Sequence, residues 1–150
     1  MNEMLKNPAV LREIIMDHYQ YPRNHKLTED DSYKKRHMAS DSCIDDITVQ
    51  SKIEDGIVKD ICFDGVACTI ATSSTSIMSE MLIGKDVQEA MKLVENYFNM
   101  VEEKDYDEDL LEEAIAFQNV SKQANRIKCA TIGWKAIREM LQESEGEVNE

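Results

Sequence analysis

The sequence has no excess of basic residues and no long apolar run. Its 150 residues include 17 lysines and arginines against 30 aspartates and glutamates, a formal net charge of −13. Repulsion at long range therefore argues against a nucleic acid or an anionic membrane as partner. No stretch approaches the roughly 18 apolar residues of a membrane span, and MNEMLKNPAV lacks the basic-then-apolar pattern of a secretory signal. We therefore expect a cytoplasmic protein.

Several motifs are also missing. The four cysteines, at positions 43, 62, 68 and 129, form no Cys-x-x-Cys pair, which excludes zinc ribbons and treble clefs. In a cytoplasmic setting they are more typical of reduced thiols that serve metal or sulfur chemistry than of a disulfide framework. The Ser/Thr run after Cys68 contains no Gly-x-Ser-x-Gly motif, so a hydrolase has little support. There is no internal repeat, and the length suits one domain, residues 1–150, that folds without a metal.

The first half of the chain predicts one helix, a polar connection and a hairpin. Asn7-Pro8 is typical of a helix start, and the helical stripe that follows ends at Tyr21-Pro22. Residues 20–42 show no periodicity and are expected to form a long, partly mobile connection. Apolar residues alternate over 47–53 and again over 57–63, which predicts an antiparallel hairpin across Asp55-Gly56.

The second half predicts helices. A short strand or loop at 66–68 leads into a small-residue helix that ends at Gly84. Asp86 and Glu89 have the spacing of a capping pair before a strongly amphipathic helix. A short helix is expected to start within the acidic stretch, a final helix covers 132–141, and 142–150 reads as a disordered tail.

The cysteines differ in where they fall on these elements. Cys43, Cys68 and Cys129 lie at element edges, where functional side chains gather, and Cys129 is expected at or before the first turn of the last helix. Cys62 lies in the middle of a strand and is interpreted as structural. Asp45 would share a side of an extended segment with Cys43. Three thiolates and a carboxylate would suit zinc or iron, although surface charge is an equally simple reading of Asp45.

Four segments in order resemble the iron–sulfur cluster assembly proteins of the NifU N-terminal/IscU type. They are Asp17-His18-Tyr19 with Pro22-Arg23-Asn24, Cys43 with Asp45, residues 63–70, and residues 126–130 before Trp134-Lys135-Ala136. The chain looks closest to the SufU-type branch, which carries an insertion between its second and third cysteines. The insertion would fall at about 102–120 here. Lys128 stands where the scaffold branch has a histidine.

The resemblance implies an α+β fold with a three-stranded antiparallel sheet and helices packed on one side. It implies Zn²⁺ bound by Cys43, Asp45, Cys68 and Cys129, with the thiols held deprotonated. It further implies that Cys43, released when a pyridoxal-phosphate cysteine desulfurase of the SufS type docks, accepts persulfide sulfur and passes it to downstream cluster assembly proteins. Whether a protein with such a sulfurtransferase-like role is itself an enzyme stays open. The alternative is a scaffold that holds iron or a transient [2Fe–2S] cluster.

Three further points bear on the site. Ile44 stands where the family has glycine, so Asp46 or a water is an alternative fourth ligand. His18 is expected to be half-buried and not a ligand. Residues 102–113 hold eight acids and one lysine, and the tail after Leu141 holds four acids, so the rest of the chain carries only −2 and the site end would be nearly neutral. The basic cluster at residues 34–36 would flank the site there and let a desulfurase dock.

Overall fold

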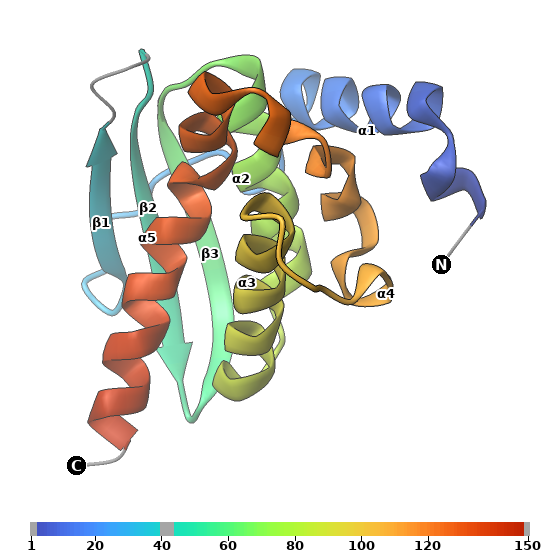
Figure 1. Ribbon diagram of the computed structural model, residues 1–150. Helices are drawn as coiled ribbons and strands as arrows, with labels where there is room; N and C mark the ends of the chain where they lie inside the picture. Colours follow the sequence, from blue (N-terminus) through green and yellow to red (C-terminus); the bar gives the residue numbers. More distant parts are fainter. Residues whose placement is uncertain (1–2, 40–43, 149–150) are drawn as a thin grey trace.

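The structure is a computed structural model, and it describes residues 3–39 and 44–148. Three strands form one antiparallel sheet in the order β1-β2-β3, and Figure 1 shows α2, α3 and α5 on one face of it. This confirms the predicted fold class. The elements are η1 (Glu3–Lys6), α1 (Pro8–Gln20), β1 (Lys34–Ala39), β2 (Asp46–Glu54), β3 (Ile57–Val66), α2 (Thr69–Leu82), α3 (Val87–Val101), α4 (Glu108–Leu111), η2 (Glu112–Phe117), η3 (Val120–Lys122) and α5 (Ala124–Val148).

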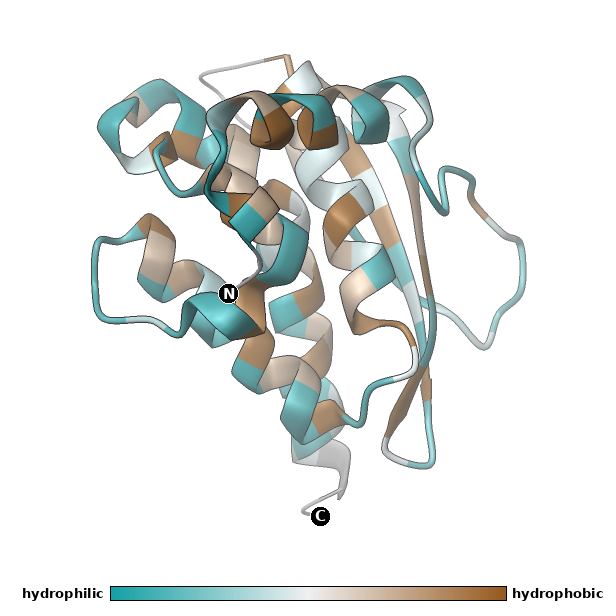
Figure 2. Cartoon of the chain, turned by 90° about the vertical axis from the view of Figure 1, so that its right-hand side faces the viewer, coloured by the Kyte–Doolittle hydropathy of each residue, from teal (hydrophilic) through white to brown (hydrophobic). Residues whose placement is uncertain are grey.

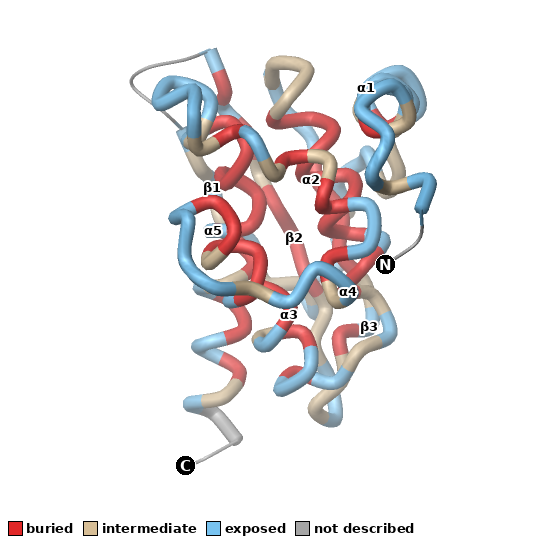
Figure 3. The backbone as a smooth tube through the Cα atoms, turned by 45° about the vertical axis from the view of Figure 1, so that its right-hand side comes forward, coloured by how far each residue is buried: buried red, intermediate tan, exposed pale blue. Residues whose placement is uncertain are grey.

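The core lies between the sheet and these three helices. Figure 2 shows apolar residues along the strands and inner helices, whereas the peripheral loops are mostly hydrophilic. Buried residues are concentrated in β2, α2 and α5, whereas most residues of α1 are exposed (Figure 3). Within the described part of the chain, no helix is long and apolar enough to cross a membrane.

Local capping signals in the sequence are confirmed. The Asn7 side chain accepts a hydrogen bond from Ala9 N at 2.9 Å, and Asp86 accepts one from Glu89 N at 2.7 Å. The hairpin turns at Asp55 and Gly56, which both have positive φ. Gly84, at φ +92°, follows the end of α2. These features depend on neighbours in sequence, which is why the sequence alone predicts them.

The expected strand order is wrong in one place. The third strand is β1, inside the predicted connection, and not the segment at 66–68. Its inward positions include Lys34 and Arg36, whose side chains pair with Glu143 of α5. Long basic side chains can cover a core with their methylene stems, so the apolar alternation that marks a strand is missing from the sequence.

Segment 24–28 covers the sheet face that the helices leave open. Phe63 N donates to Asn24 O at 3.0 Å. Gln50 exchanges two hydrogen bonds with the Thr28 backbone, at 2.8 and 2.9 Å. Cys62 lies beneath this cover, is 1% exposed, and donates to Gln50 Oε1 at 3.6 Å. The geometry agrees with a structural role for Cys62.

The Cys62 thiol is expected to resist alkylation in the folded protein. Burial, with a smaller contribution from Asp60, raises its pKa, so the reactive thiolate is scarce near neutral pH. Iodoacetamide at pH 8 should modify Cys62 at least about tenfold more slowly in native protein than in urea, because the reagent cannot reach a thiol that is 1% exposed until the fold opens. Peptide mass spectrometry gives both rates. Equal rates would contradict this burial.

Helices α2 and α5 pack at very short range. A Cβ added at Gly133 would lie 2.4 Å from Thr75 Oγ1 and 2.7 Å from Thr75 Cγ2. The small-residue run of α2, expected to allow close packing, contacts α5 here. This approach determines how near the start of α2 comes to the first turns of α5.

Gly133→Ala is therefore expected to destabilise the fold by about 1–3 kcal/mol, a typical cost of overpacking. For a chain of this size that lowers the melting temperature by about 3–10 °C. Gly146→Ala is the matched control, since it changes the same helix where nothing lies within 4 Å. It should be neutral or stabilise by up to about 1 kcal/mol. Thermal melts followed by circular dichroism compare the two, and equal melting temperatures would contradict the close packing.

Helix α5 extends further than the sequence indicates. Residues 142–148 continue the helix where the sequence favours a disordered tail. Ser144 is 7% exposed, and Glu143 pairs with β1. Tertiary contacts thus stabilise a segment whose composition is too polar to predict a packed helix.

Candidate metal centre

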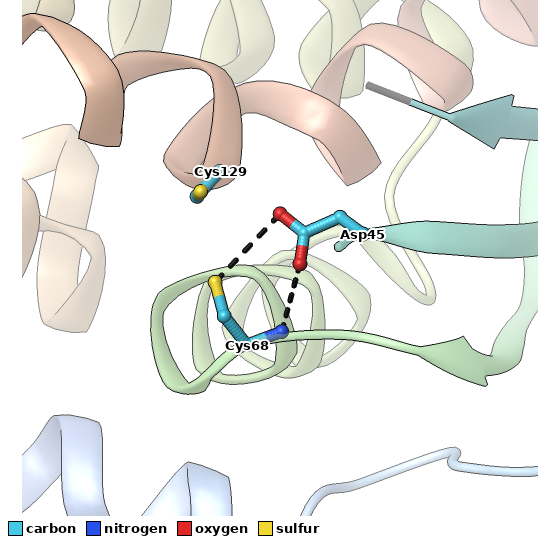
Figure 4. Close-up of side chains that lie close together, drawn as sticks. All are labelled: Asp45, Cys68 and Cys129. Carbon is cyan, nitrogen blue, oxygen red and sulfur yellow. Dashed lines mark hydrogen bonds between the residues drawn. The ribbon is translucent and has the colours of Figure 1, made fainter. Parts of the chain in front are cut away.

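Three predicted ligands meet at one end of the sheet. Asp45 lies directly before β2, Cys68 is the N-cap residue of α2, and Cys129 lies in the second turn of α5. One ligand atom from each lies within 4.8 Å of the others (Figure 4). Residues far apart in sequence therefore form a candidate metal site. Cys129 lies further into its helix than expected, because α5 begins at Ala124 and not near Ile132.

Hydrogen bonds orient the carboxylate and the Cys68 thiol. Cys68 N donates to Asp45 Oδ1 at 2.7 Å, which leaves Oδ2 3.7 Å from Cys68 Sγ. Ala71 N donates to the same sulfur at 3.4 Å. These contacts hold the Cys68 sulfur and the free Asp45 oxygen on the same side of the start of α2.

The donor set fits a zinc or iron ion. Two sulfurs at about 2.3 Å from a tetrahedral ion lie about 3.8 Å apart, and thiolate with carboxylate suits either metal. The ligand atoms here are within 4.8 Å, so small side-chain rotations would bring them to that spacing. Asp45 is 1% exposed and Cys129 2%, whereas Cys68 is partly exposed. One face of the site is therefore open.

The fourth predicted ligand, Cys43, lies outside the described residues. Ile44 is 70% exposed, so this β-branched residue is accommodated in the turn where the family has glycine. Asp46, the alternative ligand, is exposed, and its carboxylate lies 2.5 Å from His37 Nε2 on the neighbouring strand. Within the described residues, Asp46 is not grouped with Asp45 and the two cysteines.

Within the described residues, the group of possible ligands contains none of the three histidines. The expectation that His18 is half-buried is wrong: it is 1% exposed, because α2 and η2 enclose it. Its Nδ1 lies 2.7 Å from Ser76 Oγ, and its Nε2 lies 3.2 Å from Glu113 Oε2. His25 Nε2 lies 3.1 Å from Asp64 Oδ1.

The basic cluster at residues 34–36 does not flank the site. Ala39 pairs with Asp46 at the site end of the sheet, whereas Lys34 pairs with Ser51 much further along the same two strands. Lys34 and Arg36 also pair with Glu143, which partly neutralises them. The structure therefore does not support the expectation that this basic cluster helps a desulfurase dock at the site.

A hollow of about 400 Å³ opens beside Cys68. Ile15, Ile70 and Phe117 contribute apolar surface to it, and Arg126 lies at its polar side. Because Cys68 itself lines the hollow, a reagent or partner group could reach its sulfur from this side.

A buried network of polar side chains, which the sequence analysis missed, joins helices next to Cys129. Ser74 Oγ donates to Ala130 O at 2.6 Å, and Tyr97 OH donates to the same carbonyl at 2.7 Å. Trp134 Nε1 donates to Ser74 Oγ at 3.0 Å, and its ring stacks on Tyr97 with centroids 3.9 Å apart. Burial raises the pKa of Tyr97, so its hydroxyl stays a donor. Three helices are thereby joined one residue after Cys129.

Asp45→Asn is expected to weaken zinc binding at least about tenfold, or about 1.4 kcal/mol. The amide oxygen can still accept the Cys68 N–H bond, so the fold should survive while the anionic ligand is lost. Asp46→Asn makes the same charge change one residue later and should alter affinity less than about threefold. Competition with a chromophoric chelator measures both. A larger effect of Asp46→Asn would identify Asp46 as the ligand.

The fold and the Asp45–Cys68–Cys129 cluster together define an α+β protein with a candidate thiolate–carboxylate metal site. The model of the NifU-like N-terminal domain matches residues 11–149, and the chain belongs to this family. It is 37% identical over 139 residues to the zinc-dependent sulfurtransferase SufU of Bacillus subtilis, covering 92% of this chain and 93% of that protein.

Scaffold proteins of the same family are similar too. The iron–sulfur cluster assembly scaffold protein IscU of Thermotoga maritima is 37% identical over 100 residues, covering 67% of this chain and 70% of that protein. A crystal structure of SufU from Fervidobacterium islandicum AW-1 superposes with a TM-score of 0.78 and 31% identity, covering 86% of this chain and 94% of that one. The family thus joins proteins named for sulfur transfer and for scaffolding.

Proposed function

We propose that this protein accepts persulfide sulfur from a pyridoxal-phosphate cysteine desulfurase on Cys43 and passes it to cluster assembly proteins in the cytoplasm. The observation that carries the proposal is the convergence of Asp45, Cys68 and Cys129 within 4.8 Å. The nearly full-length similarity to a zinc-dependent sulfurtransferase supports it.

Cys43, Asp45, Cys68 and Cys129 would hold Zn²⁺ in this proposal. A bound zinc ion would keep the thiols ionised. The chain's own residues position the ligands. The Cys68 N–H orients the Asp45 carboxylate, and the Ser74 network holds the start of α5, which carries Cys129. The open face beside Cys68 gives a partner access.

Sulfur transfer balances without an external oxidant or reductant. The Cys43 thiolate attacks the terminal sulfur of the desulfurase persulfide. The S–S bond of the donor breaks, a new S–S bond forms on Cys43, and the desulfurase cysteine leaves as a thiolate. The persulfide on Cys43 is then the group passed to the next acceptor.

A second candidate function is a scaffold on which a transient [2Fe–2S] cluster is assembled. It is supported by the similarity to IscU proteins and by a donor set that suits iron as well as zinc. Two features favour sulfur transfer: the long acidic segment between Cys68 and Cys129, and Lys128 in place of the scaffold branch's histidine.

Anaerobic isolation followed by metal analysis distinguishes the two functions. The purified protein is assayed for zinc, iron and acid-labile sulfide, then incubated with its desulfurase and cysteine and examined by peptide mass spectrometry. Sulfur transfer predicts one zinc and one added sulfur on Cys43. Iron with acid-labile sulfide and a visible chromophore would instead establish the scaffold.

A further inference from the structure

Three neighbouring hollows lie along the acidic segment beside α1. Its middle hollow, of about 550 Å³, lies between η1, α1 and the segment of α4 and η2. It shares Glu108 and Asp109 with a hollow of about 700 Å³. It shares Glu112 and Glu113 with another of about 220 Å³. The three hollows are therefore neighbours along the acidic segment and are together called the acidic groove below.

The middle part of the acidic groove has an apolar floor. Leu5 of η1 and Val10 and Ile14 of α1 line its middle part together with Met4. Met4 is 62% exposed and Val10 is only partly buried. The floor thus keeps apolar surface in contact with water, which a second molecule could cover.

The rim of the groove is strongly negative. Glu113 lies 3.2 Å from His18 Nε2, but Glu108 and Glu112 are exposed and make no ion pair within residues 3–39 and 44–148. Lys6 is the one basic side chain among the described residues that line the groove. Its amine lies 3.8 Å from Glu3. At Glu108 and Glu112 the rim therefore has negative charge that no basic side chain of the described residues pairs with.

We propose that the acidic groove binds a basic amphipathic helix of a protein partner. Apolar side chains of that helix would cover the floor, and flanking lysines or arginines would face Glu108 and Glu112. Nucleic acids and anionic membranes carry the wrong charge for this rim. A small polycation would satisfy the rim but leave the apolar floor exposed, so a peptide segment fits both features better.

The groove is adjacent to the candidate metal centre and separate from its ligands. Glu112 and Glu113 of η2 line the groove, while Ala116 and Phe117 of the same element line the hollow that includes Cys68. Figure 1 shows α1 and α4 beyond α2, away from β1. A helix bound here would hold its protein beside the open face of the site. The proposal can be tested without sulfur chemistry.

The probe is a fluorescein-labelled peptide of about 18 residues with leucines at helical spacing and lysines on both sides of that stripe. Fluorescence anisotropy should show saturable binding to the full-length protein that weakens as salt rises. Glu108→Gln/Glu112→Gln should weaken binding about fivefold. Val10→Thr, which makes one floor position polar at constant shape, should weaken it about threefold.

Matched controls separate the groove from net charge. Glu89→Gln/Glu95→Gln makes the same charge change on exposed positions of α3, and Val66→Thr alters an apolar residue that is 61% exposed elsewhere. Both should change binding less than about twofold. Circular dichroism verifies folding of every variant. Absence of saturable binding, equal binding of a scrambled peptide, or equal weakening by the two acid pairs would each overturn the proposal.

Discussion

Cys68→Ser is expected to abolish the retention of one equivalent of zinc, with affinity falling about 1,000-fold or more. Cys68 stands at the centre of the cluster, since its sulfur faces Asp45 Oδ2 at 3.7 Å and its backbone N–H fixes Asp45 Oδ1. A serine hydroxyl is shorter than a thiol and ionises far less readily, so it cannot replace a thiolate ligand. Elemental analysis and chelator competition measure the loss.

The substitution isolates metal binding from folding. Serine is among the preferred N-cap residues, so α2 should begin as it does in the wild type. Cys62→Ser is the matched control, because it removes the same thiol from a buried position on the other face of the sheet. It should cost stability but leave zinc content unchanged. Stoichiometric zinc in Cys68→Ser protein would show that the metal lies elsewhere.

Cys43→Ser is expected to lower persulfide formation on this protein about 100-fold or more when it is incubated with its desulfurase and cysteine. Serine supplies no thiolate, and the three thiols of the described residues are poor substitutes. Cys62 and Cys129 are 1% and 2% exposed, and Cys68 is proposed to hold the metal. Peptide mass spectrometry locates the added sulfur.

The Cys43→Ser experiment has two controls. Cys62→Ser should accept sulfur as the wild type does, because its thiol is covered by segment 24–28. Zinc content measured on the same samples shows whether the remaining ligands still retain metal. Wild-type amounts of persulfide on Cys43→Ser protein would assign the acceptor role to another cysteine and contradict the proposed mechanism.

Local sequence signals predicted most of the fold. Caps at Asn7 and Asp86 and the turn at Asp55-Gly56 depend on short-range geometry, and all three occur as expected. Strand β1 was missed because Lys34 and Arg36 occupy inward positions that apolar residues usually fill. The extension of α5 was missed because the end of this helix is polar in sequence. Glu143 pairs with Arg36 and Ser144 is buried, and neither contact can be seen from the sequence.

The candidate site was predictable only in part. Placing Asp45, Cys68 and Cys129 together required the family resemblance, since no Cys-x-x-Cys spacing marks them. The Ser74–Tyr97–Trp134 network could not be found from the sequence, because no motif links its members. Ser74 and Trp134, which share a hydrogen bond, are 60 positions apart. The acidic residues Glu108 and Glu112 are visible in the sequence, but the apolar floor beside them comes from η1 and α1, which lie far away in the chain.

The most direct test of the central claim is an anomalous diffraction map at the zinc edge from crystals of the purified protein. The account predicts one peak about 2.3 Å from the sulfurs of Cys68 and Cys129 and about 2.0–2.2 Å from an Asp45 oxygen. Full occupancy at that position would establish that these residues share one ion. Zinc bound by other residues, or no peak between these three in protein that contains zinc, would contradict it.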